Sequence, residues 1–192
     1  TITFSDGTTQ TFTLGFTDWA VSPVSFNNGV VATMPYRNSI SGQRQSIKMY
    51  VFYAGVSVPA NKTIKSVTLP STITGGQLHV FAVGTGAVSL PAYNNVGITN
   101  DSNITPGNYD GWGNSYSAQA LQAAGLNAGD NAFDPTRKVV FTWPGVPAGT
   151  AENYQANGQV IPVTPVANAT ILAFLGSSTN GPSSGSAKIT YT

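Results

Sequence analysis

The chain contains no cysteine, which excludes disulfide bonds, thiol nucleophiles and thiolate metal sites. Charged residues make up only 8% of the sequence, and the formal net charge is +1. The eight Lys and Arg residues are scattered along the chain, with only Arg137 and Lys138 adjacent, so the sequence lacks the basic cluster that binds nucleic-acid phosphates. Nucleic acid is therefore not an expected partner.

Histidine is nearly absent, because His79 is the only one. A catalytic triad or a multi-histidine metal site therefore cannot form within the chain, and His79 lies in the apolar run LHVFAV, which predicts a buried structural role. No spacing among the carboxylates suggests the facing pair that glycoside hydrolysis needs. We therefore expect no catalytic residues and no enzymatic activity. The carboxylates are Asp6, Asp18, Asp101, Asp110, Asp130, Asp134 and Glu152.

Long apolar runs are also absent, since none approaches the roughly 20 residues that span a bilayer. The first ten residues, TITFSDGTTQ, lack the basic and apolar regions of a signal peptide, so we expect that any export signal has been removed. A surface rich in Thr, Ser, Asn and Gln with few charges is common in extracellular bacterial β-proteins. We expect an extracellular or cell-surface location without membrane insertion.

Apolar residues are plentiful, at 41% of the chain with 10% aromatic, which is enough to offset the chain entropy of folding. Polar and apolar residues alternate at Ile2 and Phe4 and again from Phe12 to Phe16, with Asp6-Gly7 between them, which predicts an N-terminal hairpin. Strand after strand in this pattern favours a sandwich. The further predicted strands are Ser46 to Tyr53, Ile64 to Leu69, Gln77 to Val83, Lys138 to Trp143, Gln159 to Val163, Ala169 to Leu175 and Ser186 to Thr192.

One helix is predicted from Ser115 to Ala124, with Ser115 as its cap and Gly125 as its stop signal. The stretch from Asn94 to Gly113 is rich in Asn, Asp and Gly and reads as a long loop. Loops of this length in compact domains tend to be functional or tightly packed on themselves. This loop is therefore the expected place for a ligand site.

The two ends of the chain repeat each other. The last five residues, KITYT, have β-branched and aromatic residues at the same positions as the first five, TITFS. DGTTQTFTLGF follows the first copy, whereas the chain stops after the second, so we expect the terminal strand to lack a hairpin partner. An unpaired strand edge is a template for another chain. The predicted assembly strands are Thr1, Ile2, Thr3, Phe4, Ser5, Lys188, Ile189, Thr190, Tyr191 and Thr192.

Several long phrases of the sequence resemble a galactose-binding-like accessory domain found in many secreted bacterial glycosidases. YNNVGITNDSN (93–103), NYDGWGNSYSAQAL (108–121), VVFTWPGVPAGTAENYQANGQVIPV (139–163) and ILAFLGSSTNGPSSGSAKITYT (171–192) resemble its first half. Its second half is represented by DGTTQTFTLGFTDW, ATMPYRN, KMYVFYAGVSV, SVTLP and LHVFAVG, which lie ahead, within residues 6–84. The resemblance implies an all-β antiparallel β-sandwich of jelly-roll type, with one short helix, in circularly permuted order. Trp112 is a departure, because the family usually has glycine there.

On this resemblance, residues 1–192 form one permuted unit in which 1–87 matches the family's second half and 88–192 its first half. Three arrangements are compatible with the permutation. The halves close within one monomer, or the chain is one period of a tandem array, or residues 88–192 of one subunit are completed by the DGTTQ hairpin and following strands of the next. The duplicated strand favours the third arrangement, a head-to-tail polymer, because a simple permutant needs only one copy.

The long loop offers candidates for two kinds of ligand. Aromatic faces stack on sugar rings and amide or carboxylate groups bind hydroxyls, and the family resemblance favours carbohydrate; core packing is the alternative for the same aromatics. The carbohydrate-binding candidates are Tyr109, Asp110, Trp112, Asn114 and Tyr116. Oxygen ligands also suit calcium, for which Asp101, Asn103 and Asp110 are weak candidates without the EF-hand spacing; no other cofactor is expected.

The leading hypothesis is therefore a structural one: a secreted, non-catalytic subunit whose partners are copies of itself, joined by terminal strands into a filament or repeat array. The competing hypothesis is a carbohydrate-binding accessory module of a secreted glycoside hydrolase, with polysaccharide as the partner.

Overall fold

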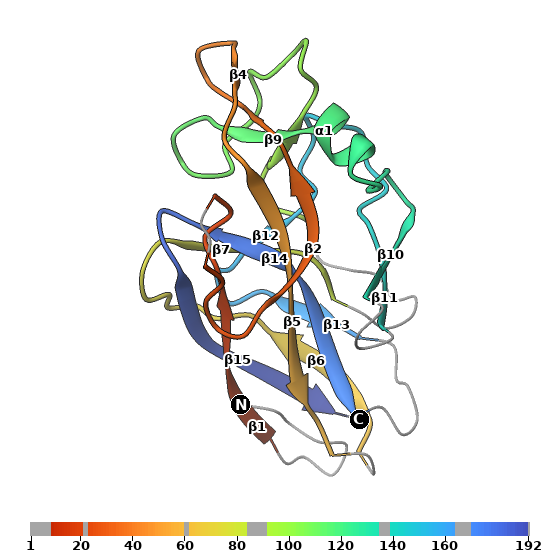
Figure 1. Ribbon diagram of the computed structural model, residues 1–192. Helices are drawn as coiled ribbons and strands as arrows, with labels where there is room; N and C mark the ends of the chain where they lie inside the picture. Colours follow the sequence, from red (N-terminus) through yellow and green to blue (C-terminus); the bar gives the residue numbers. More distant parts are fainter. Residues whose placement is uncertain are drawn as a thin grey trace.

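The computed structural model describes residues 9–20, 23–59, 62–83, 92–134, 139–163 and 170–191. It is an all-β antiparallel sandwich with one short helix, α1 (Ala118–Ala123). The first layer, here called the outer sheet, has the strand order β1-β15-β6-β13. Its strands are β1 (Thr9–Phe16), β15 (Ser183–Tyr191), β6 (Ile64–Thr68) and β13 (Val160–Pro162). In Figure 1 this sheet forms the lower part of the body.

The second layer, the central sheet, has the order β12-β7-β14-β5-β2. Its strands are β12 (Tyr154–Gln155), β7 (Gln77–Val83), β14 (Ile171–Thr179), β5 (Met49–Ser57) and β2 (Gly29–Met34). Successive side chains of a strand point to opposite faces. In β14, Leu172 and Phe174 enter the core shared with the outer sheet, whereas Ala173 and Leu175 enter a second core on the other face. The central sheet is therefore buried on both faces.

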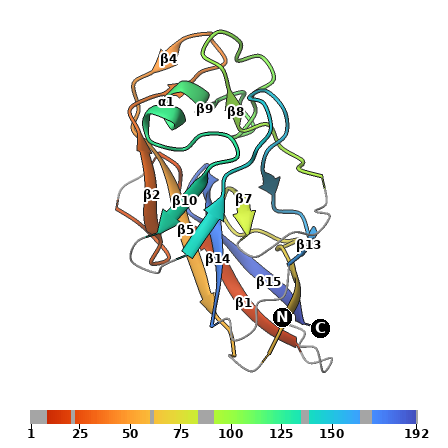
Figure 2. The same cartoon turned by 90° about the vertical axis from the view of Figure 1, so that its right-hand side faces the viewer.

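The second core is covered by α1, a hairpin and a small sheet at the upper end of Figure 1. Figure 2 shows α1 and the hairpin on the same side of the central sheet. The hairpin pairs β10 (Asn131–Asp134) with β11 (Val139–Thr142). The small sheet has the order β4 (Arg44–Gln45), β3 (Arg37–Asn38), β9 (Ser115–Ser117) and β8 (Ile98–Thr99), and its β8–β9 pair is parallel. Burial on both sides explains why central strands such as MYVFYA read as continuous apolar runs.

The predicted strands are confirmed where they are described, with shifted ends: β7 runs from Gln77 to Val83 as predicted, whereas β14 continues past Leu175 to Thr179. The helix begins later than predicted. Ser115 belongs to β9, and the cap is Ser117, whose Oγ accepts a hydrogen bond from the Ala120 backbone N–H at 3.0 Å. Gly125 ends the helix as predicted, with a φ of +87° that suits glycine.

Within the described ranges, no helix is long and apolar enough to cross a membrane.

Candidate functional site

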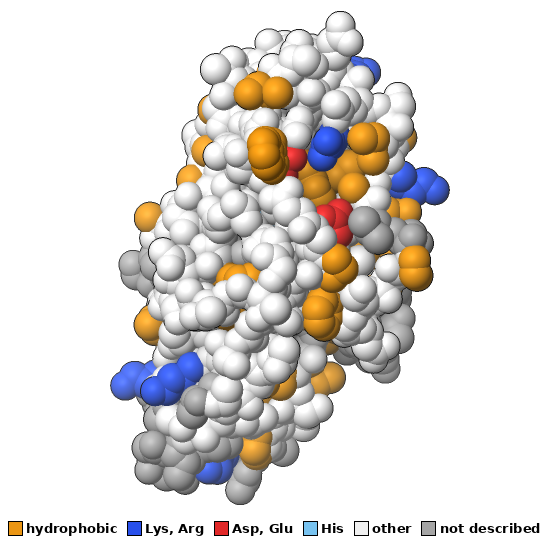
Figure 3. Space-filling model, turned by 90° about the vertical axis from the view of Figure 1, so that its left-hand side faces the viewer, with side chains coloured by type: hydrophobic (Ala, Val, Ile, Leu, Met, Phe, Trp, Pro, Cys, Tyr) orange, Lys and Arg blue, Asp and Glu red, His pale blue; other side chains and the backbone are white. Residues whose placement is uncertain are grey.

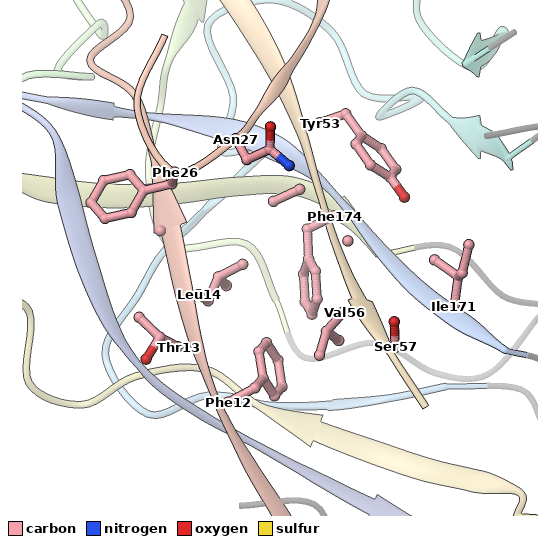
Figure 4. A pocket seen from close by; sticks show the side chains of 13 residues that line it. Phe12, Thr13, Leu14, Phe26, Asn27, Tyr53, Val56, Ser57, Ile171 and Phe174 are labelled. Atoms are coloured by element: carbon pink, nitrogen blue, oxygen red, sulfur yellow. The ribbon is translucent and has the colours of Figure 1, made fainter. Parts of the chain in front are cut away.

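A cleft opens between strand β1 of the outer sheet and strand β5 of the central sheet (Figure 4). It has a volume of about 400 Å³. Phe12 and Leu14 of β1 face Val56 of β5 and Phe174 of β14 across it, and Phe26 lies at one end (Figure 4). None of the described residues that line it is charged. The cleft therefore presents partly exposed apolar surface along the side of the sandwich.

Strand β1 borders this cleft and is the last strand of the outer sheet. One edge of β1 pairs with β15, and no other strand in the described part of the chain pairs with its outer edge. The sequence of β1, TQTFTLGF, contains no proline and no charged residue, although these are the usual features that protect edge strands from association. Among the described residues, the Phe26 ring and a bond from Asn28 Nδ2 to the Gly15 carbonyl at 3.1 Å cover the end of this edge near Gly15.

The C-terminal strand is paired on both sides within the same chain, so the expectation that it lacks a partner is wrong. Lys188 lies opposite Thr11 of β1 and Thr68 of β6. Ile189 is fully buried between the two large sheets, as its apolar character predicts. Antiparallel strands can pair without a short turn between them. The C-terminal segment KITYT therefore pairs with β1, the strand that the predicted hairpin had paired with the N-terminal segment TITFS. Residues Thr1 to Ser5 and Thr192 lie outside the described residues.

The long loop contributes an exposed tryptophan, Trp112, whose side chain is 71% accessible to solvent. Its position is set by buried Asp110, whose Oδ1 accepts a bond from the Trp112 N–H at 2.9 Å and whose Oδ2 accepts one from Asn114 Nδ2 at 2.6 Å. Arg37 forms an ion pair with Asp110 at 3.6 Å. Ile40, 69% accessible, packs close to Gly113 beside Trp112. Figure 3 shows a mostly white face with few charged groups, and in its upper half hydrophobic side chains gather beside acidic and basic groups.

Four of the five carbohydrate-binding candidates are buried, namely Tyr109, Asp110, Asn114 and Tyr116. Tyr109 and Tyr116 are fully buried in the second core, and both hydroxyls hydrogen-bond to Ser177 Oγ, at 2.7 and 3.0 Å. Burial raises the pKa of both phenols above the ordinary value, and Trp19 packs on both rings. These two tyrosines therefore cannot stack on a sugar in solution. Of the three candidate aromatics, only Trp112 offers an open face.

The weak calcium candidates have other partners. Asp101 accepts hydrogen bonds from the hydroxyls of Tyr36 and Ser117 and forms an ion pair with Arg44 at 2.5 Å. Asn103 is exposed and joins a tight turn through its backbone N–H. Asp110 is paired with Arg37 as described above. Within the part of the chain that is described, no three acidic, His or Cys side chains gather to hold a metal ion.

A buried polar chain at the edge of the second core connects His79, Asn153 and Glu152. Asn153 Oδ1 lies 2.9 Å from His79 Nδ1, and Asn153 Nδ2 donates to Glu152 Oε1 at 2.7 Å. Burial lowers the pKa of His79 to about 4, which keeps the ring uncharged at neutral pH, as its predicted structural role requires. Burial raises the pKa of Glu152 to about 8, although bonds from Asn153 and the Gly97 and Ile98 backbone oppose the shift.

Sequence reasoning missed Glu152, because a single carboxylate without a partner at a diagnostic spacing gives no signal of its own. Its neighbours in the sequence, TAENYQ, resemble an ordinary loop. Only the folded chain brings Glu152 and Asn153 to His79 and to the backbone of Gly97.

No family model matches the chain, and neither curated proteins nor solved structures include a significant match to it. The all-β sandwich architecture is therefore shown by the strand pairing of this chain and not by a relative.

Proposed function

We propose that this protein is a non-catalytic structural subunit of an extracellular assembly, in which copies join head to tail by addition of a terminal strand. The acceptor is the outer edge of β1, and the donor is the Thr1–Ser5 segment of a neighbouring copy. The observation that carries the proposal is the open, uncharged edge of β1 above the apolar cleft. Such an edge offers a complete row of backbone hydrogen-bonding groups to an incoming strand.

The sequence of the donor supports this choice. TITFS repeats the residue pattern of KITYT, and β1 already pairs with the described part of KITYT in a defined register. Ile2 and Phe4 alternate with polar residues, so both apolar side chains of an added strand face the same side. The cleft presents Phe12, Leu14 and Phe26 to that side. The donor carries no charged side chain and therefore brings no desolvation cost of a buried charge.

A heterologous contact of this kind does not close on itself unless the rotation between copies completes a ring. Each copy carries one donor and one acceptor, so addition continues from copy to copy. The expected product is a filament or a long array, and the same contact would also join neighbouring units of a tandem chain.

The experiment compares the intact chain with a variant that lacks Thr1–Ser5, by light scattering after size-exclusion chromatography and by electron microscopy. The intact chain is expected to form polymers and the truncated chain only monomers. Thr13→Lys, which places a charge on the β1 edge beside the cleft, is expected to block assembly. The matched control is Val160→Lys on β13, the opposite edge strand of the same sheet. Polymers that persist without residues 1–5 would refute the proposal.

A second candidate function, carbohydrate binding, is favoured by one observation: Trp112 holds an exposed ring beside Ile40 and next to the polar Asp110–Arg37 pair. Exposed tryptophan beside hydrogen-bonding groups is typical of sugar platforms. The resemblance to galactose-binding-like accessory domains supports the same ligand class. A glycan array tests this candidate, with binding by the intact chain and its loss in Trp112→Ala as the expected result. Absence of binding to every glycan would reject it.

A further inference from the structure

Three asparagines of the chain directly precede a glycine, namely Asn28, Asn157 and Asn180. In such a pair the backbone nitrogen of the glycine can attack the side-chain carbonyl carbon of the asparagine, because glycine has no β-carbon to hinder the close approach. The attack also requires that the asparagine side chain turn freely toward the next residue. Hydrogen bonds that hold the amide in another orientation therefore slow the reaction, and the three pairs differ in such bonds.

The side chain of Asn28 is held at both ends of its amide group. Its Oδ1 accepts a hydrogen bond from the Thr17 backbone N–H at 2.8 Å, and its Nδ2 donates one to the Gly15 carbonyl at 3.1 Å. Thr17 itself is fully buried. Asn28 therefore cannot turn toward Gly29 without losing two bonds to the folded body.

In the Asn180–Gly181 pair, both reacting groups are engaged. Asn180 Nδ2 donates a hydrogen bond to the Asp110 carbonyl at 2.9 Å. The Gly181 N–H, which contains the attacking nitrogen, donates to Oδ2 of buried Asp18 at 2.7 Å. Reaction at this pair must therefore break a bond on each side.

Asn157 is exposed and lies in the connection between β12 and β13. Its backbone N–H donates to Gln159 Oε1 at 2.7 Å, whereas its side-chain amide makes no hydrogen bond to any described residue. The Gly158 N–H donates to the Pro70 carbonyl at 3.0 Å, and this is the bond that the attack must break. Of the three pairs, Asn157–Gly158 therefore has the side chain that is free to react.

We propose that Asn157 is a site of spontaneous deamidation. The Gly158 nitrogen forms a bond to Asn157 Cγ and loses its proton, and the bond from Cγ to Nδ2 breaks, so that ammonia leaves with that proton. Solvent water then opens the resulting cyclic imide at one of its two carbonyl carbons, which gives aspartate or isoaspartate at position 157.

The modification changes both the charge and the backbone of this turn. A carboxylate replaces a neutral amide, so the formal net charge of the chain falls from +1 to 0, and a net charge near zero promotes association. Isoaspartate also adds one carbon to the backbone before Gly158, so the bond to Pro70 is expected to be lost. The turn leads into β13, at the opposite edge of the outer sheet from β1, so the site is separate from the proposed strand acceptor.

The test follows the full chain during incubation at mildly alkaline pH by site-resolved peptide mass spectrometry. Asn157 is expected to deamidate at least about tenfold faster than Asn28 and Asn180, which corresponds to about 1.4 kcal/mol from the hydrogen bonds that hold those two. Isoelectric focusing should show a more acidic form that accumulates at the same rate. Conversion at Asn28 or Asn180 that is as fast as at Asn157, or an Asn157 that stays intact, would overturn the proposal.

The same incubation in strong denaturant is the control for the fold. All three pairs then lose their hydrogen bonds, so their rates should become similar. A preference for Asn157 that persisted in denaturant would come from neighbouring residue types and would contradict the structural argument.

Two variants test whether the acidic form arises at this position. Asn157→Gln keeps the amide but moves it one carbon away from the attacking nitrogen, and is expected to prevent the acidic form. The matched control is Asn103→Gln, at an exposed asparagine that precedes Ile104 instead of glycine, and it should leave the rate unchanged. Thermal unfolding checks that both variants fold. An acidic form that still accumulated in Asn157→Gln would place the reaction elsewhere and reject the proposal.

Discussion

Gln10 and Ile189 lie directly opposite each other on paired strands, although they come from the two ends of the sequence. The same Ile189 lies opposite Val67 of β6 on its other side. The last strand of the chain is thus an interior strand of the outer sheet, and the open edge belongs to the first described strand. In the proposed assembly, the edge of β1 is therefore the acceptor.

Truncation of Ile189 should be costly, because its side chain is fully buried in the core between the two large sheets. Ile189→Ala is expected to lower the free energy of unfolding by about 2–5 kcal/mol, measured by urea denaturation of the monomer. Ile2→Ala is the matched control, since Ile2 occupies the equivalent place in the repeated N-terminal segment. Destabilisation by Ile2→Ala together with no effect of Ile189→Ala would show that the N-terminal copy, and not the C-terminal one, occupies this place in the sheet.

Glu152 and His79 should give the stability of the fold opposite pH dependences. Glu152 has a pKa of about 8 in the folded chain and 4.5 as its ordinary value, so the folded state holds the extra proton and stability falls as pH rises between these values. His79 has a pKa of about 4 against an ordinary 6.5, so stability falls as pH drops through that interval. The two trends offset each other between pH 4.5 and 6.5, and only the Glu152 trend remains above it.

The Glu152→Gln variant separates these contributions. In this variant stability should rise with pH from about 4 to 6.5 and then level off, because only the His79 contribution remains. Chemical denaturation at a series of pH values measures both curves. Wild-type and variant curves that run parallel would show that the pKa of Glu152 does not change on folding.

The three tryptophans should respond differently to a soluble quencher. Trp112 is 71% accessible, whereas Trp19 and Trp143 are buried in the second core. Acrylamide should quench the emission of Trp112 strongly, and Trp112→Phe should remove most of the quenchable fluorescence with less than about 0.5 kcal/mol change in stability. A largely unquenchable wild-type emission would contradict the exposed position of Trp112.

Glycine at position 125 should be required to end helix α1, since its φ is +87°. Gly125→Ala is expected to cost about 1–2 kcal/mol, because a β-carbon disfavours the left-handed conformation. Gly145→Ala is the control: its φ is not in that region and a β-carbon there would lie 3.6 Å from the nearest atom. Differential scanning calorimetry compares the two, and equal effects would argue against a conformational role for Gly125.

Most strands could be predicted because their patterns are local. The run from Gln77 to Val83 is mostly apolar and rich in β-forming residues, and β7 has those bounds. The predicted helix cap was two residues too early, because Ser115 and Ser117 both carry a hydroxyl group that can cap a helix. Ser115 pairs with Asn38 of β3 as part of β9, so the helix begins later and Ser117 is its cap. Likewise, ligand binding and core packing are both compatible with the aromatic loop at the level of sequence, and only the fold separates buried Tyr109 from exposed Trp112.

The amino-acid sequence by itself determined the all-β class, the single short helix and the absence of disulfide chemistry, because residue type and alternation act on the local backbone. It also placed two similar strands at the two ends. The tertiary structure alone decided that the terminal copy pairs with both β1 and β6, that β1 is the edge strand of the outer sheet, and that Glu152 connects through Asn153 to His79. These are properties of contacts between residues far apart in the chain, and pairing across such distances depends on the packing of the whole sandwich.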